Sequence, residues 1–316
     1  MRRGSGGTAV DDTERTMPMR KQRVISAIVL IALAAVATAL GSYVLGALIL
    51  VFICMGIYEI YKAFENKGFK PLYVFGFCFA GLFLLQTVFQ TPEVLNLYLG
   101  DTFLGGEKGV LKDCTKLLSV NWATIYSVLL LIALLTVMVF KHDKHTPADA
   151  AITVFGAVYV TVLTSYSLSL RELDEGKGGL FLFLLALLTD IAADTAAYEV
   201  GSRWGKHKLI PSVSPKKTVE GSIGAFGGAI LAALIMGLLF TLTGWFTGLK
   251  LFWYPIIGLL VGFLAQVGDL AASVIKRYAG IKDFSNLIPG HGGILDRLDS
   301  LMFVFPTVYY LVRLVM

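Results

Sequence analysis

The sequence predicts an all-α, polytopic integral membrane protein with about nine transmembrane helices and a cytoplasmic N-terminus. The chain has 316 residues, of which 56% are hydrophobic and 16% are charged, and its mean hydropathy is +0.73. Soluble domains are about 45–50% apolar and about a quarter charged, so this composition indicates a protein of the lipid bilayer. Two further observations support the prediction, namely the lengths of the apolar runs and the uneven placement of lysine and arginine.

The apolar runs give the expected helices in order. A span needs about 20 mostly apolar residues, and it must be helical because backbone groups cannot stay unpaired in lipid. The first long run divides near Gly41 and Ser42 into two helices. The expected helices cover residues 24–64 (two helices), 71–89, 122–140, 150–170, 179–200, 222–243, 251–275 and 300–316. We interpret residues 1–23 as a disordered tail or an expression remnant.

Two regions follow from this order. Residues 24–170 form an N-terminal set of about five helices. Residues 171–316 form a region of about four helices, with cytoplasmic loops at 201–221 and 276–299. Polar residues that suggest chemistry gather in this second region.

Lysine and arginine predict the orientation, because they concentrate in cytoplasmic segments. With the N-terminus inside, the predicted cytoplasmic segments hold 20 of the 27 lysines and arginines, and the loop 90–121 lies outside. The net charge of +5 is therefore a topology signal and an attraction to anionic lipid heads. It does not indicate nucleic-acid binding.

Five carboxylates gather near the predicted cytoplasmic ends of three helices. Asp190 and Asp194 are four residues apart, Asp296 and Asp299 are three apart, and Asp269 lies on the helix between these pairs. Such spacings put each pair on one helix face. One intramembrane carboxylate could also hold helices together, as the less favoured alternative, but five at one level favour a functional site. Oxygen donors without cysteine or histidine suit Mg²⁺, which binds one or two carboxylates plus substrate phosphates.

The loop 201–221 complements these carboxylates. Its lysines and hydroxyls precede the N-terminus of helix 222–243, and this arrangement attracts anions, although it also fits an ordinary positive-inside loop. The residues are Lys206, Lys208, Lys216, Lys217, Ser212, Ser214 and Thr218, with Ser222 at the start of that helix. Gly224 and Gly228 favour a helix-packing face over a phosphate cradle. Together the two sets suggest chemistry on a phosphorylated lipid with a phosphorylated co-substrate.

The stretch SVIKRYAGIKDFSNLIPGHGGILDRLDS, residues 273–300, resembles the signature of the phosphatidate cytidylyltransferases, or CDP-diacylglycerol synthases. It has Ser, Lys-Arg, Lys-Asp, Pro-x-His-Gly-Gly and Asp-Arg-x-Asp in the order of that family. Residues 194–228 look like a second family block, in which Ala225 and Phe226 interrupt the glycines. The N-terminal helices resemble the family only in being hydrophobic.

The resemblance implies transfer of the cytidylyl group of CTP to phosphatidate, giving CDP-diacylglycerol and pyrophosphate, with Mg²⁺ as cofactor. Asp269, Asp296 and Asp299 would hold the metal, and Lys276 and Arg297 would act in catalysis with them. The residues expected to bind substrate are Asp190, Asp194, Ser214, Lys216, Lys217, Thr218, Ser273, Arg277, Lys282, Asp283, His291, Gly292 and Gly293. No protein nucleophile is needed, because a phosphomonoester with a second pKa of about 6 is largely dianionic at pH 7.

We therefore expect a multi-pass protein of the cell inner membrane with its active site on the cytoplasmic side. The oligomeric state is open, with a homodimer as one alternative. A CTP-dependent polyprenol or phytol kinase is the second enzyme reading, and the Pro-x-His-Gly-Gly-x-x-Asp-Arg-x-Asp run argues against it. The CDP-alcohol phosphotransferase pattern is absent. A cation transporter would more often place its carboxylates near the bilayer midplane, within internal repeats.

Overall fold

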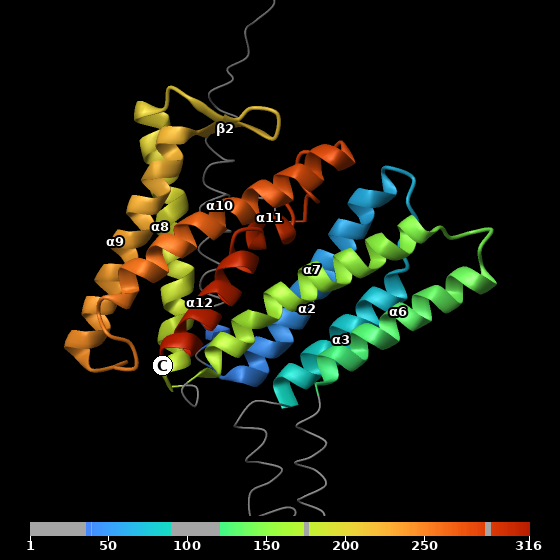
Figure 1. The fold of residues 1–316 in the computed structure, drawn as a ribbon, viewed down its shortest axis with the longest axis horizontal. Coiled ribbons are helices and arrows are strands. Elements are labelled where there is room, and N and C mark those ends of the chain that lie inside the picture. The colour runs from blue at the N-terminus through green and yellow to red at the C-terminus, as the bar shows by residue number, and fades with distance from the viewer. Residues whose placement is uncertain (1–35, 39, 90–120, 174–176, 288–291) are drawn as a thin grey trace, which may run out of the picture.

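The computed structural model describes residues 36–38, 40–89, 121–173, 177–287 and 292–316. Its described part is almost entirely helical (Figure 1). The helices are α2 (Ser42–Glu65), α3 (Tyr73–Phe89), α6 (Trp122–Phe140), α7 (Pro147–Arg171), α8 (Lys177–Trp204), α9 (Val219–Thr243), α10 (Trp253–Ala279), α11 (Leu295–Leu298) and α12 (Leu301–Val315). In these residues seven helical segments are long and apolar enough to cross a membrane, with α11 and α12 counted as one segment, and α3 is shorter. The predicted all-α, polytopic membrane fold is confirmed.

The helix bounds follow the apolar runs closely, with differences at the ends that carry the polar residues. The division near Gly41 is confirmed, because α2 begins at Ser42 after a glycine with φ +108°. However, α8 continues to Trp204 and α10 continues to Ala279, beyond the predicted ends. Most of the first predicted helix and the tail 1–23 lie outside the described residues, so the count of nine stays a prediction.

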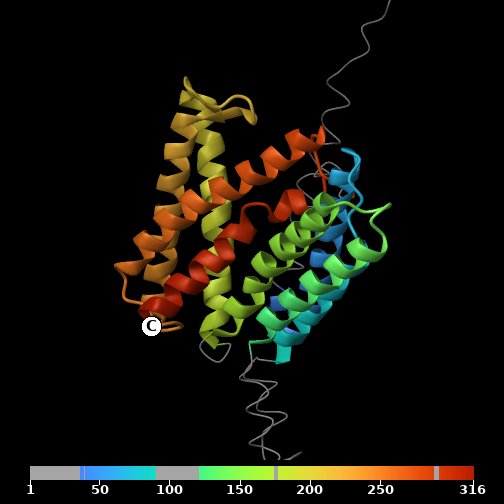
Figure 2. The same ribbon diagram turned by 45° about the vertical axis from the view of Figure 1, so that its right-hand side comes forward.

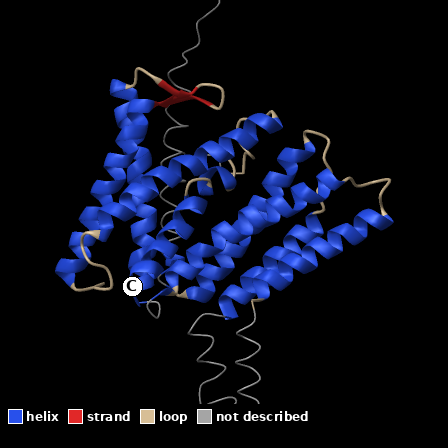
Figure 3. Cartoon of the chain, viewed as in Figure 1, coloured by secondary structure: helices blue, strands red, loops and turns tan. Residues whose placement is uncertain are grey.

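The segment 201–221, predicted as a loop, contains a β-hairpin that was not expected from the sequence. Strand β1 (Lys208–Ile210) pairs antiparallel with β2 (Ser214–Thr218), with Lys208 opposite Thr218. These are the only strands in the described part of the chain (Figure 3). Strand β1 has only three residues and β2 is polar, so neither shows an alternating apolar pattern. Pro215 is tolerated because each strand of a two-stranded sheet is an edge strand.

The helices form two groups, which the last helix joins. In Figures 1 and 2, α2, α3, α6 and α7 lie together, whereas α8, α9 and α10 form the second group. Helix α12 packs against α7, α8 and α10. The predicted boundary at residues 170–171 falls at the end of α7, but the division into two domains stays a prediction.

Helices α8 and α9 pack with their backbones in close approach. A Cβ atom at Gly228 would lie 2.5 Å from the Cβ of Ala196, and one at Gly224 would lie 2.7 Å from the Cβ of Val200. The interpretation of these glycines as a packing face is confirmed. The hairpin connects these two helices and therefore stands on a tightly packed base.

The connections that the sequence assigns to the cytoplasm lie at one end of the bundle. Figure 1 shows this end at the top, where α2, α6, α8 and α10 finish and where α3, α7 and α9 begin. The opposite end holds the C-terminus. This alternation agrees with the predicted topology in the described residues. We call the first of these ends the hairpin end.

Candidate active site

A cleft of about 510 Å³ opens at the hairpin end, between α8, the hairpin, the start of α9 and α10. It collects polar residues from segments far apart in the sequence. The lining residues that concern the chemistry are Asp194, Tyr198, Ser202, Lys216, Lys217, Thr218, Ser222, Gln266 and Asp269. The cleft thus brings together the predicted lysine loop and two of the predicted carboxylates.

Lys217 and Asp269 form the ion pair inside this cleft. The Lys217 Nζ atom lies 2.5 Å from Asp269 Oδ2, with side chains 27% and 32% exposed. The other oxygen, Asp269 Oδ1, accepts a long 3.4 Å hydrogen bond from the Ser273 hydroxyl. Ser273 is buried one turn further along α10. The pair is therefore partly open to solvent, so a phosphate can reach its lysine.

A second, more buried group lies where α10 meets α11. Lys276 Nζ lies 2.7 Å from Asp296 Oδ1 and 4.0 Å from Asp299 Oδ2. The three side chains are only 5–13% exposed. One lysine therefore neutralises part of the charge of two buried carboxylates, and an ion pair in this environment is hardly screened by water.

Asp296 also organises the loop before α11. Its Oδ2 atom accepts hydrogen bonds from the amides of Phe284 at 2.8 Å and Gly293 at 2.9 Å. Gly292 has φ +84°, and a Cβ there would lie 2.8 Å from the same oxygen. The glycine therefore meets two requirements, a left-handed backbone and close approach to the carboxylate. In this arrangement Asp296 is committed to the protein, whereas Asp299 has fewer protein donors.

The remaining carboxylates make the centre of the site strongly acidic. Asp190 is 5% exposed, and its Oδ2 atom accepts from the Ser300 hydroxyl at 3.0 Å. Its Oδ1 atom has no hydrogen-bond partner among the described residues. The charges of Asp194, Asp269 and Asp299 all act on Asp190. The four carboxylates repel one another, so their arrangement favours binding of a cation.

The donor set suits Mg²⁺ chemically but does not form a closed cage. In the described residues no group of three or more His, Cys, Asp or Glu side chains is arranged to hold a metal ion. Mg²⁺ usually takes only one or two carboxylates and completes its shell with phosphate oxygens and water. The oxygens of Asp269 and Asp299 therefore fit a metal that arrives with a triphosphate.

Two of the residues predicted to bind substrate make structural contacts within the protein. Arg277 donates from Nε to the Val213 carbonyl and from Nη1 to the Ile281 carbonyl, both at 3.2 Å, which ties the hairpin turn to the end of α10. Thr218 caps α9 by accepting from the amide of Gly221 at 3.1 Å. Their roles toward substrate stay predictions.

The other predicted residues are dispersed. Ser214 begins β2, and Lys282 and Asp283 are exposed in the loop after α10 and do not line the cleft. Arg297 is on α11, and its charge acts on Asp194. His291 lies outside the described residues.

Two residues near this site come from the N-terminal helices, for which the sequence predicted no role in the site. Glu59 of α2 is buried and hydrogen-bonded to the start of α11. Tyr159 of α7 is close enough to Asp299 to interact electrostatically, and its buried hydroxyl has no partner among the described residues. A charged residue inside a membrane span is a functional candidate by default. This rule identified Asp190, and it would have identified Glu59 as well.

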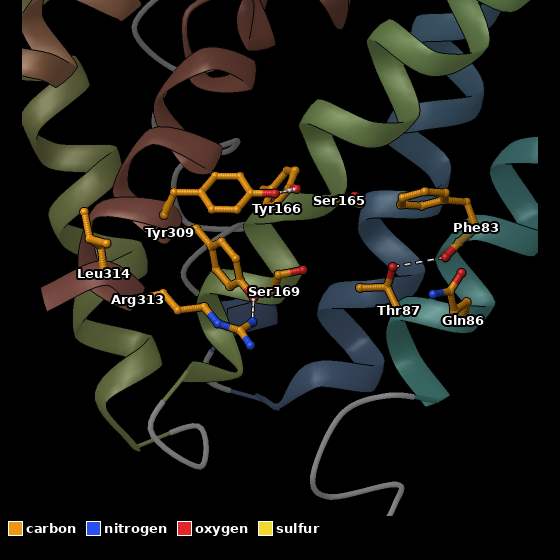
Figure 4. Close-up of a pocket in the computed structure, with 10 residues that line it drawn as sticks. Phe83, Gln86, Thr87, Ser165, Tyr166, Ser169, Tyr309, Arg313 and Leu314 are labelled. Carbon is orange, nitrogen blue, oxygen red and sulfur yellow. Dashed lines mark hydrogen bonds between the residues drawn. The ribbon is translucent and has the colours of Figure 1, made fainter. Parts of the chain in front are cut away.

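A second cavity lies at the opposite end of the bundle. It has a volume of about 440 Å³ and lies between α3, α7 and α12 (Figure 4). Tyr166, Tyr309 and Arg313 line it, and Arg313 donates to the Tyr309 hydroxyl. No carboxylate is among its described lining residues. Tyrosine and arginine are common at membrane interfaces, so the hairpin end remains the candidate active site.

Seven helical segments long and apolar enough to cross a membrane, with carboxylates and lysines at one cleft, indicate a membrane protein with a site suited to phosphates in the described part of the chain. The sequence profile of the cytidylyltransferase family matches residues 21–315, so the chain belongs to this family.

Its relatives include proteins named phosphatidate cytidylyltransferase. The one from Synechocystis sp. is 32% identical over 323 residues, covering 94% of this chain and 98% of the relative. The one from Bacillus subtilis is 37% identical over 190 residues, covering 60% of this chain and 67% of the relative.

Proposed function

We propose that this chain transfers the cytidylyl group of CTP to phosphatidate and releases pyrophosphate. The observation that carries this proposal is the meeting of Lys217–Asp269 and Lys276–Asp296–Asp299 at one membrane-embedded site. Membership of the cytidylyltransferase family and the names of the relatives support the same substrates.

The reaction needs charge neutralisation and positioning more than it needs a protein nucleophile. A lipid phosphate oxygen attacks the α-phosphorus of CTP, the bond from the α-phosphorus to the bridging oxygen breaks, and pyrophosphate leaves with the electron pair. Lys217 and Lys276 can each exchange a carboxylate for a phosphate oxygen. Positioned cations of this kind stabilise the charge that shifts to the leaving group.

We propose that Asp269 and Asp299 hold Mg²⁺ together with the triphosphate. Mg²⁺, when bound, would supply positive charge to the phosphate oxygens. Asp296 can take part only through Oδ1, which Lys276 occupies here, so its predicted metal role depends on this lysine turning to a phosphate.

We also propose that the hairpin end faces the cytoplasm, at the inner membrane of the cell. The basic segments at this end support that orientation, and CTP is a soluble cytoplasmic nucleotide. A homodimer stays a prediction.

Isotopic labelling of CTP tests the function. Purified protein in detergent, given phosphatidate, should move label from the α-phosphorus into lipid, and γ label should appear in pyrophosphate. A lipid kinase with the same carboxylates and lysines would instead move γ label into lipid and release CDP. A transporter would leave both substrates unchanged.

The stereochemistry at a chiral α-thiophosphate tests the mechanism separately. A single in-line displacement should invert the configuration at the α-phosphorus. Net retention would indicate a covalent nucleotidyl-enzyme and would contradict the mechanism without a protein nucleophile.

A further inference from the structure

Glu59 is a buried carboxylate that α2 contributes to the other half of the protein. Its side chain is 2% exposed. The Oε1 atom accepts from the Ser285 hydroxyl at 2.6 Å and from the amide of Ile294 at 3.0 Å. The Oε2 atom accepts from the amide of Leu295 at 2.8 Å. All three donors are neutral, and all three belong to the loop and helix start that precede Asp296.

These contacts supply partners that the helix itself cannot provide. The first amides of a helix have no acceptor within the helix, and a buried amide without a partner destabilises the protein because its lost contact with water is not replaced. Helix α11 is only four residues long, so its own hydrogen bonds cannot hold it in place. Glu59 fixes Ile294 and Leu295 from a different helix.

Gly293 fits this contact closely. A Cβ atom at this position would lie 2.4 Å from Glu59 Oε1 and 2.5 Å from Oε2. Its amide meanwhile donates to Asp296. The same short segment is thus held by Glu59 on one side and by Asp296 on the other, and Asp296 is held in turn by Lys276.

We infer that Glu59 is a positioning residue for the reaction. It positions the segment that carries Asp296 and Asp299 relative to Lys217 and Asp269, which line the cleft. Glu59 does not line the cleft, so it acts through these residues and does not touch the substrate there. The inference rests on the proposed function only for its kinetic readout.

The test compares Glu59→Gln with Glu65→Gln in full-length protein. Glutamine keeps the size of the side chain but replaces one acceptor oxygen by an NH₂ donor, so the amide of either Ile294 or Leu295 loses its acceptor. Glu65 is on the same helix and pairs with Lys62 at the surface, which makes it a matched control. We expect kcat to fall roughly 100-fold in Glu59→Gln, as for a small misplacement of catalytic groups, and to stay near wild type in Glu65→Gln.

The split between kinetic constants separates positioning from general loss of structure. The KM for CTP should change by less than about threefold, because an interaction needed only in the transition state affects kcat. Gly293→Ala should reproduce the loss of kcat, because its Cβ displaces the carboxylate without removing the charge. A folded Glu59→Gln protein with wild-type kcat overturns the inference. A loss of activity that is fully explained by a smaller fraction of folded protein overturns it too.

Hydrogen exchange gives a readout that does not depend on activity. The amides of residues 293–295 should exchange roughly tenfold faster in Glu59→Gln, while those in the middle of α12 should not change. Unchanged exchange at residues 293–295 would also overturn the inference. A wild-type protein that makes no CDP-diacylglycerol would count against the proposed function alone, since exchange would still decide the role of Glu59.

Discussion

Replacing Lys276 with methionine would leave two carboxylates in the protein interior without their cation. Lys276 is 11% exposed and lies 2.7 Å from Asp296 and 4.0 Å from Asp299. Removing one partner of a buried ion pair costs about 3–5 kcal/mol. We expect Lys276→Met to lower the free energy of unfolding by this amount, because methionine fills the space of the lysine stem and the loss is then mainly electrostatic.

Equilibrium unfolding in mixed micelles with increasing SDS, followed by circular dichroism, measures this change. The double variant Lys276→Met/Asp296→Asn should lose about 1.5–3 kcal/mol less free energy of unfolding than the losses of the two single variants added together. This difference is the value of a charge-assisted hydrogen bond. The control is Lys62→Met, which breaks the surface pair with Glu65 and should change little. A Lys276→Met protein as stable as wild type, or single variants that simply add, would refute the reasoning.

Three further predictions concern the site and the topology. Asp299→Asn should abolish turnover without lowering the free energy of unfolding. Asp296→Asn should lower both turnover and the free energy of unfolding, because three protein donors bind Asp296. Equal unfolding curves for the two variants would contradict this difference. Lys217→Ala should raise the KM for the substrate whose phosphate it binds by about 10- to 150-fold, which corresponds to a contact of about 1.5–3 kcal/mol. Lys216→Ala should have a smaller effect, because Lys216 is exposed. Unchanged kinetics in both variants would mean that the lysines of this loop serve only the membrane topology. Cys114, which lies outside the described residues, should react with a membrane-impermeant thiol reagent on intact cells, and reaction only after permeabilisation would reverse the orientation.

The membrane helices could be predicted because hydrophobic length is a local property. A run such as 122–140 specifies its helix without information from the rest of the chain, and α6 has these bounds. Helix ends were less predictable where polar residues continue the helix. Lys276 and Arg277 were assigned to a loop, yet they occupy the last turn of α10, where positive charge is favourable beside the helix carboxyl end.

The site was predicted in composition but not in its pairing. The sequence indicated that carboxylates and lysines meet at one membrane surface, and the cleft contains Lys217 and Asp269. It did not indicate that Lys276 pairs with Asp296, 20 residues away, because such contacts depend on how α10 and α11 cross. Glu59 was missed for the same reason, since its partners are more than 220 residues further along the chain.

The contact between Glu59 and Gly293 links two positions that evolution would have to change together. A relative with a smaller residue at position 59 would leave room for a Cβ at position 293, and it would need another acceptor for the amides of the following helix. A relative that keeps the glutamate can accept only glycine at position 293, where a Cβ would lie 2.4 Å from the carboxylate. The glycine of the motif therefore reflects a constraint imposed by a helix near the start of the chain, in addition to the substrate contact predicted for it.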